Sequence, residues 1–156
     1  MIDRNARRKA ALLVRRFADG EITNDDFANE WPREERDRAL RAIEQTLWGA
    51  YDDLSIHRLA GDHALNGFGR ALFARCALFL DSDLEYEWPR DRLYSGERYS
   101  HTSIWLSLGL LAFLDRHFKH CYEEQEAAGD SAVWPFIRHA DVNGAGSIFV
   151  GDLSRE

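Results

Sequence analysis

The sequence predicts an all-α fold, a single helical domain over residues 1–156. Apolar residues recur every three or four positions through long stretches of the chain, which is the period of a helix. No series of segments alternates apolar and polar residues in the way that strands do. All three prolines directly follow a tryptophan, and proline is typical of helix boundaries. We expect a bundle of four or five helices around one core.

The first two predicted helices precede the first Trp-Pro pair. One covers residues 4–19 and ends at Gly20. The apolar side chains that share one side of it are Leu12, Leu13 and Phe17. Thr23 or Asn24 can then accept a backbone hydrogen bond at the start of a short helix. That helix is expected to end at Trp31-Pro32, because the residue before a proline is disfavoured in the helical conformation.

Two further apolar stripes follow at helical spacing. A longer helix is predicted from Arg33 toward Gly61, with its stripe at Leu40, Ile43, Leu47, Tyr51 and Leu54. The next stripe, with Asn66 as its candidate cap, runs through Leu65, Phe68, Leu72, Cys76, Phe79 and Leu80. Cys76 and Cys121 both occur in apolar stretches, so we expect buried thiols of the kind found in a reducing cytoplasm.

The predicted helix over residues 102–127 is the most apolar one. Ile104 to Leu114 is apolar on nearly every side, which is typical of a helix at the centre of a bundle. This run is too short to cross a membrane. Residues 90–101 before it show no clear period and are expected to form a loop. Near the C-terminus, Ser147 to Val150 favours one short strand.

The three Trp-Pro pairs predict buried tryptophans. A large ring at a helix boundary can fold back and hold the incoming chain against the core. Two of the pairs share the longer pattern Glu-Trp-Pro-Arg followed by an acidic residue. We therefore expect the rings of Trp31, Trp88 and Trp134 to lie in the core.

The net charge of −7 is unevenly distributed along the chain. The first 16 residues hold six arginine or lysine residues against one aspartate, a local charge of +5 that leaves −12 for the rest. We interpret this as a basic helix lying against an acidic body. Nucleic acid is not expected as a partner, because the acidic body would repel phosphates. The short apolar run near the N-terminus predicts neither a signal peptide nor a membrane partner, and the expected location is the cytoplasm.

The densest polar cluster is the acidic segment from Asp81 to Glu87, which has four carboxylates in seven residues. Its candidate partner-binding residues are Asp83, Glu85, Tyr86 and Glu87. Long-range attraction would speed the encounter with a basic protein, and a tyrosine ring offers contact area at low entropic cost. The alternative interpretation is that the carboxylates form salt bridges with nearby arginines, namely Arg75, Arg90 and Arg92.

The stretch from Leu80 to Pro89, together with Ala132 to Phe136, resembles stretches of small bacterial proteins that have no assigned activity. The resemblance covers about half of the chain. It implies a bacterial origin for this protein. It implies no activity, ligand or catalytic residue, so the functional interpretation depends on the residues themselves.

A metal site is the main alternative to a protein-binding surface. His117, His120 and Glu124 share one face of the predicted 102–127 helix, so they could grip a metal ion from one side. Further ligands would have to come from another helix. His57 and Asp53 are the candidates for them.

A calcium loop is a second alternative. The stretch from Asp141 to Asp152 follows part of the calcium-loop pattern, including its central glycine. Ala145 removes one oxygen ligand, and Asp152 is shorter than the glutamate that normally closes such a loop. We therefore expect a glycine turn at this place.

Taken together, these patterns favour a non-enzymatic bacterial domain that binds another protein with a basic surface. Neutralising proteins of the immunity type, which block a basic toxin or nuclease, are one class with this character. We predict no catalytic residue, no metal and no cofactor. The alternative function is a metal-dependent enzyme of the helical-bundle kind that uses His117 and His120.

Overall fold

The computed structural model describes an N-terminal helical body and a C-terminal piece packed on it. The described residues are 1–33, 36–49, 51, 54–89, 124 and 127–145. Every regular element within them is a helix, so the predicted all-α fold is confirmed there. The predicted central helix over residues 102–127 lies almost entirely outside this part of the chain. Cys121, the predicted loop at 90–101 and the predicted strand at 147–150 lie outside it completely.

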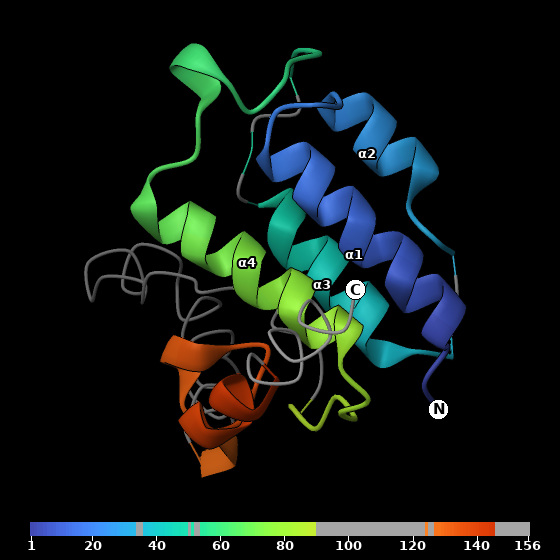
Figure 1. Cartoon of the computed structure of the whole chain (residues 1–156), viewed down its shortest axis with the longest axis vertical. Helices are drawn as coiled ribbons and strands as arrows, with labels where there is room; N and C mark the ends of the chain where they lie inside the picture. Colours follow the sequence, from blue (N-terminus) through green and yellow to red (C-terminus); the bar gives the residue numbers. More distant parts are fainter. Residues whose placement is uncertain (34–35, 50, 52–53, 90–123, 125–126, 146–156) are drawn as a thin grey trace, which may run out of the picture.

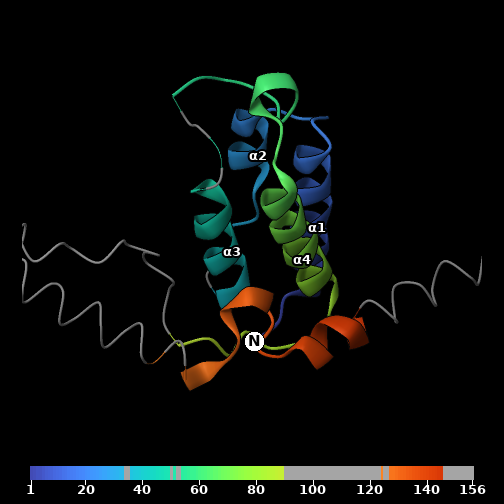
Figure 2. The ribbon, with the colours of Figure 1, turned by 90° about the vertical axis from the view of Figure 1, so that its left-hand side faces the viewer.

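Four α-helices make up the described body: α1 (Arg4–Ala18), α2 (Asn24–Glu30), α3 (Arg38–Trp48) and α4 (Gly67–Asp81). Two short 3-10 turns accompany them, η1 (Gly61–His63) and η2 (Ser131–Val133). Residues 139–145 are helical as well. Helix α1 packs most extensively along α4 and also contacts α2 and α3 (Figures 1 and 2). The result is a bundle in which α1 touches α2, α3 and α4.

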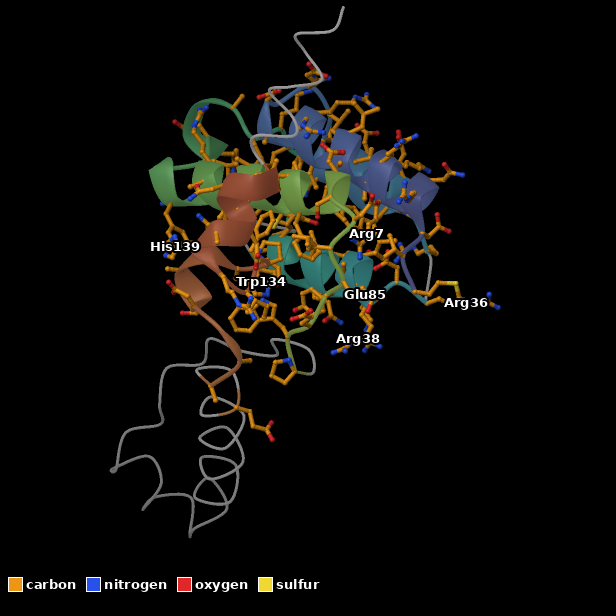
Figure 3. The ribbon with its side chains drawn as sticks, turned by 60° about the horizontal axis from the view of Figure 1, so that its bottom comes forward. Arg7, Arg36, Arg38, Glu85, Trp134 and His139 are labelled. Atoms are coloured by element: carbon orange, nitrogen blue, oxygen red, sulfur yellow. The ribbon has the colours of Figure 1, made fainter. Side chains whose placement is uncertain are left out.

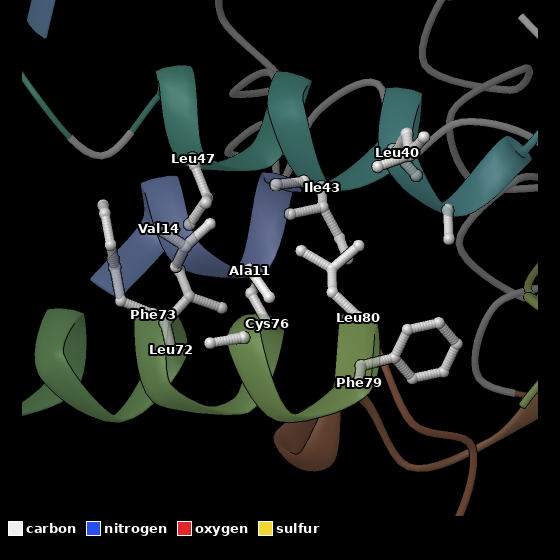
Figure 4. Packing of buried hydrophobic residues seen from close by; sticks show 14 of the residues in the cluster. Ala11, Val14, Leu40, Ile43, Leu47, Leu72, Phe73, Cys76, Phe79 and Leu80 are labelled. Carbon is white, nitrogen blue, oxygen red and sulfur yellow. The ribbon is translucent and has the colours of Figure 1, made fainter. Parts of the chain in front are cut away.

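The core of the bundle lies between α1, α3 and α4 (Figure 4). Helix α1 buries Ala10, Ala11, Leu13, Val14 and Phe17. The large side chains that meet them from the two neighbouring helices are Leu40, Ile43 and Leu47 of α3, and Leu72, Phe73, Cys76, Phe79 and Leu80 of α4.

Helix α1 begins at an aspartate cap and buries one face. The Asp3 carboxylate accepts a hydrogen bond from the Ala6 backbone N–H at 2.9 Å, which satisfies a free N–H group of the first turn. Leu13 is buried as predicted, whereas Leu12 is exposed. Leu12 lies about 200° around the helix from Ala10, so it points away from the face that holds Ala10, Val14 and Phe17.

Helix α2 begins and ends where the sequence predicts. The Thr23 hydroxyl oxygen accepts from the Asp26 backbone N–H at 3.1 Å, and the Asp26 carboxylate accepts from the Thr23 backbone N–H at 3.0 Å. These reciprocal hydrogen bonds form a capping box. The helix ends at Glu30, directly before Trp31-Pro32.

Helix α3 is shorter than predicted at both ends. It begins at Arg38 and not at Arg33, because the Asp37 carboxylate caps it by accepting from the Ala39 backbone N–H at 3.1 Å. It ends at Trp48, and the predicted stripe residue Leu54 is 92% exposed. Beyond α3, Ser55 and His57 form hydrogen bonds with Asn24 at the start of α2.

Helix α4 begins at the predicted cap. The Asn66 side-chain oxygen accepts from the Gly69 backbone N–H at 2.8 Å. Cys76 is buried, as expected for a structural thiol. Phe68, which the stripe placed in the core, is exposed because the buried position of the first turn belongs to Gly69.

All three tryptophans of the Trp-Pro pairs are buried, which confirms their predicted place in the core. The second and third pairs pack together. The Trp88 indole N–H donates to the backbone carbonyl oxygens of Pro135 and Phe136, at 3.0 and 3.2 Å. The rings therefore join the chain after α4 to the C-terminal piece, which lies beneath the bundle (Figure 1).

The C-terminal piece corrects one prediction. Residues 139–145 are helical, so Asp141 and Gly144 lie in a helix and not in a glycine turn. The Asp141 backbone N–H donates to the Arg138 carbonyl at 3.1 Å. A calcium loop needs its oxygen ligands to converge through a tight turn at the glycine, whereas a helix directs its side chains outward.

Truncating Trp88 should destabilise the fold strongly. Trp88→Ala removes a buried ring and two hydrogen bonds, so we expect the free energy of unfolding to fall by about 3–5 kcal/mol. Trp48→Ala is the matched control, because Trp48 is 57% exposed and its loss should cost about 0.5 kcal/mol or less. Urea unfolding of both variants measures the difference, and similar costs would contradict the role of Trp88 as an anchor.

Candidate functional site

The acidic segment, Asp81 to Glu87, begins at the last residue of α4, continues through Ser82 in an extended conformation and has no regular structure over residues 83–87. Glu85 and Glu87 are exposed, whereas Tyr86 and Trp88 are buried. Successive side chains of an extended chain point to opposite sides. Because the two rings are held in the core, the two carboxylates are turned toward solvent.

Tyr86 is an anchor of the fold. Only 8% of it is exposed, and its ring packs edge-on against Phe79 with the centroids 6.3 Å apart. Its hydroxyl accepts a hydrogen bond from the Trp134 indole N–H at 3.2 Å, and the Arg38 guanidinium lies 5.8 Å from the ring centroid. The ring that we predicted as contact area for a partner is thus covered by the fold. The alternation of the extended chain is the physical reason.

Two arginines hold the backbone of the acidic segment from the side of the bundle. One Arg7 nitrogen, Nη1, donates to the Leu84 carbonyl at 2.8 Å and to the Ser82 carbonyl at 3.4 Å. Arg38 donates to the carbonyl of Trp88 at 2.9 Å. Figure 3 shows Glu85 beside these two arginines at the edge of the bundle. The backbone that carries the carboxylates of Glu85 and Glu87 is therefore held in place.

Arg7 is itself held by a buried ion pair with Asp37. Both side chains are 2% exposed, and the two join through paired hydrogen bonds of 2.6 and 3.0 Å. The Asp37 carboxylate also accepts from the backbone N–H groups of Asp3 and Ala39, each at 3.1 Å. The guanidinium carbon of Arg7 lies 5.4 Å from the centroid of the Phe79 ring. This pair was not predicted from the sequence, although Arg7 occupies a position on the apolar face of α1.

The protonation of Asp37 reflects two opposing effects. Burial alone would raise the pKa of its carboxyl group. The hydrogen bonds from Arg7 and from the backbone N–H groups of Asp3 and Ala39, with the positive charge of Arg7, outweigh burial and hold the pKa below its ordinary value. Asp37 is therefore ionised and paired at neutral pH.

The remaining carboxylates of the segment divide into paired and unpaired groups. Asp81 forms an ion pair with Arg15, and Asp83 pairs with Arg4 at 2.8 Å in a largely exposed position. Both arginines belong to α1, so the basic helix does lie against acidic groups of the body. Of the arginines that we considered as partners, Arg75 instead donates to the Trp134 carbonyl at 3.1 Å. The other two, at positions 90 and 92, lie outside the described residues.

Glu85 and Glu87 keep their charge at the surface. Both are exposed, and neither forms an ion pair within the described part of the chain. Exposed pairs such as Arg4–Asp83 contribute little to stability, typically about 0–1 kcal/mol, so Asp83 can exchange its partner at small cost. The acidic segment thus offers two unpaired carboxylates and a third that is weakly held.

The candidate metal ligands are mostly outside the structure's described residues, including His117, His120 and Asp53. His57 is described, and its ring nitrogen Nδ1 lies 2.9 Å from the Ser55 carbonyl oxygen. Its ring stacks on that of His63 with the centroids 4.1 Å apart. Across the residues that are described, no three or more His, Cys, Asp or Glu side chains are grouped so that they could hold a metal ion.

Comparison with known proteins returns no relative of this chain. No family model matches it, and it matches no curated protein and no solved structure. Among the described helices, none combines the length and the apolar character that a membrane crossing requires. The functional interpretation therefore depends on the geometry of the acidic segment.

Removing the charge of Asp37 should destabilise the protein far more than removing a surface charge. Asp37→Asn leaves the Arg7 guanidinium buried without a counter-charge, so we expect a loss of about 3–5 kcal/mol in the free energy of unfolding. Asp83→Asn breaks an exposed pair and should cost at most about 1 kcal/mol. Urea unfolding at neutral pH measures both variants. Equal costs would show that the buried pair is not a special constraint.

The contribution of Asp37 should also depend on pH. Its pKa is lowered in the folded protein, so its stabilising effect is complete above the ordinary value of 3.8 and is lost as the pH falls through the folded value. We expect the stability difference between wild type and Asp37→Asn to shrink below about pH 4. Urea unfolding at a series of pH values tests this, and a constant difference would contradict it.

Proposed function

We propose that this chain is a non-enzymatic protein-interaction domain that binds a basic surface of another protein through Asp83, Glu85 and Glu87. The observation that supports this most directly is the fixed position of Glu85 and Glu87 at the surface. They are exposed and unpaired among the described residues, on a backbone whose neighbouring rings are buried. A surface of fixed negative charge is suited to recognition of a positive one.

The fixed backbone favours binding for an entropic reason. A flexible acidic loop would lose conformational freedom when a partner orders it, and that loss would weaken the complex. Here the Arg7 and Arg38 hydrogen bonds already hold the carbonyls of Leu84 and Trp88. The backbone of the acidic segment is already ordered by folding, so a partner does not have to order it. The attraction between the carboxylates and a basic surface can then contribute fully to binding.

The class of partner follows from the charge. Long-range attraction between the acidic body, with its net charge of −7, and a basic protein would raise the association rate, most strongly at low salt. A neutralising protein that covers the basic surface of a bacterial toxin or nuclease fits this description. In this role Tyr86 supports the surface from within and makes no contact with the partner.

Charge-neutralising variants test the proposal. We would compare the wild type with Glu85→Gln/Glu87→Gln in capture from a lysate of the native host, followed by titration of the purified partner. The matched control is Glu21→Gln/Glu30→Gln, which removes the same charge from exposed positions near Arg16. We expect the first variant to weaken binding by about fivefold or more at low salt and the control to have little effect.

Folding must be separated from recognition in this experiment. Both double variants change exposed side chains, so their circular dichroism and thermal midpoints should match those of the wild type. An equal loss of binding in both variants would indicate a general charge effect and not a defined surface. Unchanged binding of the Glu85→Gln/Glu87→Gln variant would contradict the proposal.

A further inference from the structure

The exposed face of α1 carries two cations that the fold leaves unpaired. Arg8 and Lys9 are both exposed, and neither forms a hydrogen bond or an ion pair within the described part of the chain. Leu12, one turn after Arg8 on the same side of the helix, is 56% exposed. The other surface arginines of α1 are already paired, as Arg4 is with Asp83. We call Arg8, Lys9 and Leu12 the basic strip.

The acidic segment carries the complementary set of groups. Its exposed glutamates, Glu85 and Glu87, form no ion pair among the described residues. Leu84, directly before them, is 38% exposed. The basic strip and the acidic segment therefore each present two unpaired charges and one exposed leucine, and their charges are opposite in sign.

The two sets lie on neighbouring parts of the molecule. The Arg7 guanidinium donates to the Leu84 carbonyl at 2.8 Å, and Figure 3 shows Glu85 beside Arg7. The next residue of α1, Arg8, lines a hollow of about 100 Å³ together with Asp83. The strip belongs to a helix and the backbone of the segment is held by Arg7, so the unpaired charges of one molecule stay apart.

We propose that two copies of this chain associate about a two-fold axis, with the basic strip of each copy lying on the acidic segment of the other. A two-fold contact needs a surface that is complementary to itself, and a face with both sets of groups meets this requirement. The contact is then made twice in each dimer. Exposed ion pairs contribute little individually, so the dimer is expected to be weak and reversible.

This inference does not rest on the proposed function, because it concerns only the chain and its own copies. The two are connected at one point. The dimer would cover Glu85 and Glu87, so a basic partner would compete with the second copy for the acidic segment.

The net charge of the chain makes a sharp test available. Two copies of net charge −7 repel each other at long range, which opposes the dimer. Glu85→Lys/Glu87→Lys lowers that repulsion, since each change adds two charges and the net charge becomes −3. An association governed by net charge would therefore strengthen, whereas the proposed dimer loses its opposite charges and should weaken. The matched control is Glu21→Lys/Glu30→Lys, which has the same net charge and leaves both surfaces unchanged.

Sedimentation equilibrium of the full chain at about 0.1 M ionic strength measures these differences. The wild type should show a reversible monomer–dimer equilibrium. The dissociation constant of the dimer should rise about tenfold or more in Glu85→Lys/Glu87→Lys and in Arg8→Glu/Lys9→Glu, and it should not rise in the control. An equimolar mixture of the two reversed variants should form mixed dimers, because each contact then joins opposite charges again.

Each result either supports the dimer or overturns it. A wild type that stays monomeric, or that forms open chains larger than a dimer, would overturn the proposal. So would association of Glu85→Lys/Glu87→Lys as strong as that of the control, or the absence of mixed dimers. Circular dichroism checks the fold of every variant. If a reversed variant does not fold, the Gln substitutions at the same two positions replace it, and unchanged association would then count against the proposal.

Discussion

The buried ion pair of Arg7 and Asp37 is the constraint on which the rest of the structure depends. Either charge alone in the core would cost several kcal/mol, so the fold is stable only when both arrive in register. The same two side chains form further hydrogen bonds. Asp37 caps α3, and Arg7 binds the carbonyl of Leu84. One ion pair thus positions α1, the start of α3 and the acidic segment relative to one another.

The fold could be predicted from the sequence where a regular pattern meets a local cap. Thr23 and Asn66 were recognisable because their side chains bond to backbone N–H groups three residues away, which is a local property. The start of α3 was missed for a non-local reason. The residues after Arg33 are as compatible with a helix as those after Asp37, and the choice between them depends on Arg7, 30 residues earlier. Beyond α3, Ser55 and His57 are likewise held by a residue that is distant in the sequence, Asn24.

The candidate site was predictable in composition and not in geometry. A cluster of carboxylates is visible in the sequence, but the side to which each points depends on which neighbours are buried. Tyr86 was predicted at the surface because the sequence does not show that Trp134, 48 residues later, donates a hydrogen bond to its hydroxyl. The position of Arg7 did carry a signal, because it shares the face of α1 with Ala11 and Val14. A charged residue in an apolar stripe predicts a buried partner, but it does not identify the partner.

Buried and exposed side chains alternate along residues 85–88, so the support of the fold and the proposed recognition fall to neighbouring residues of one segment. The inward residues, Tyr86 and Trp88, hold the segment to the C-terminal piece, and the outward residues, Glu85 and Glu87, carry its free charge. An extended backbone has no internal hydrogen bonds, so its carbonyls need outside donors. Here arginines supply them, and they also bring positive charge beneath a negative surface. A change at Arg7 would therefore alter the surface through the fold, whereas a change at Glu85 alters the surface alone.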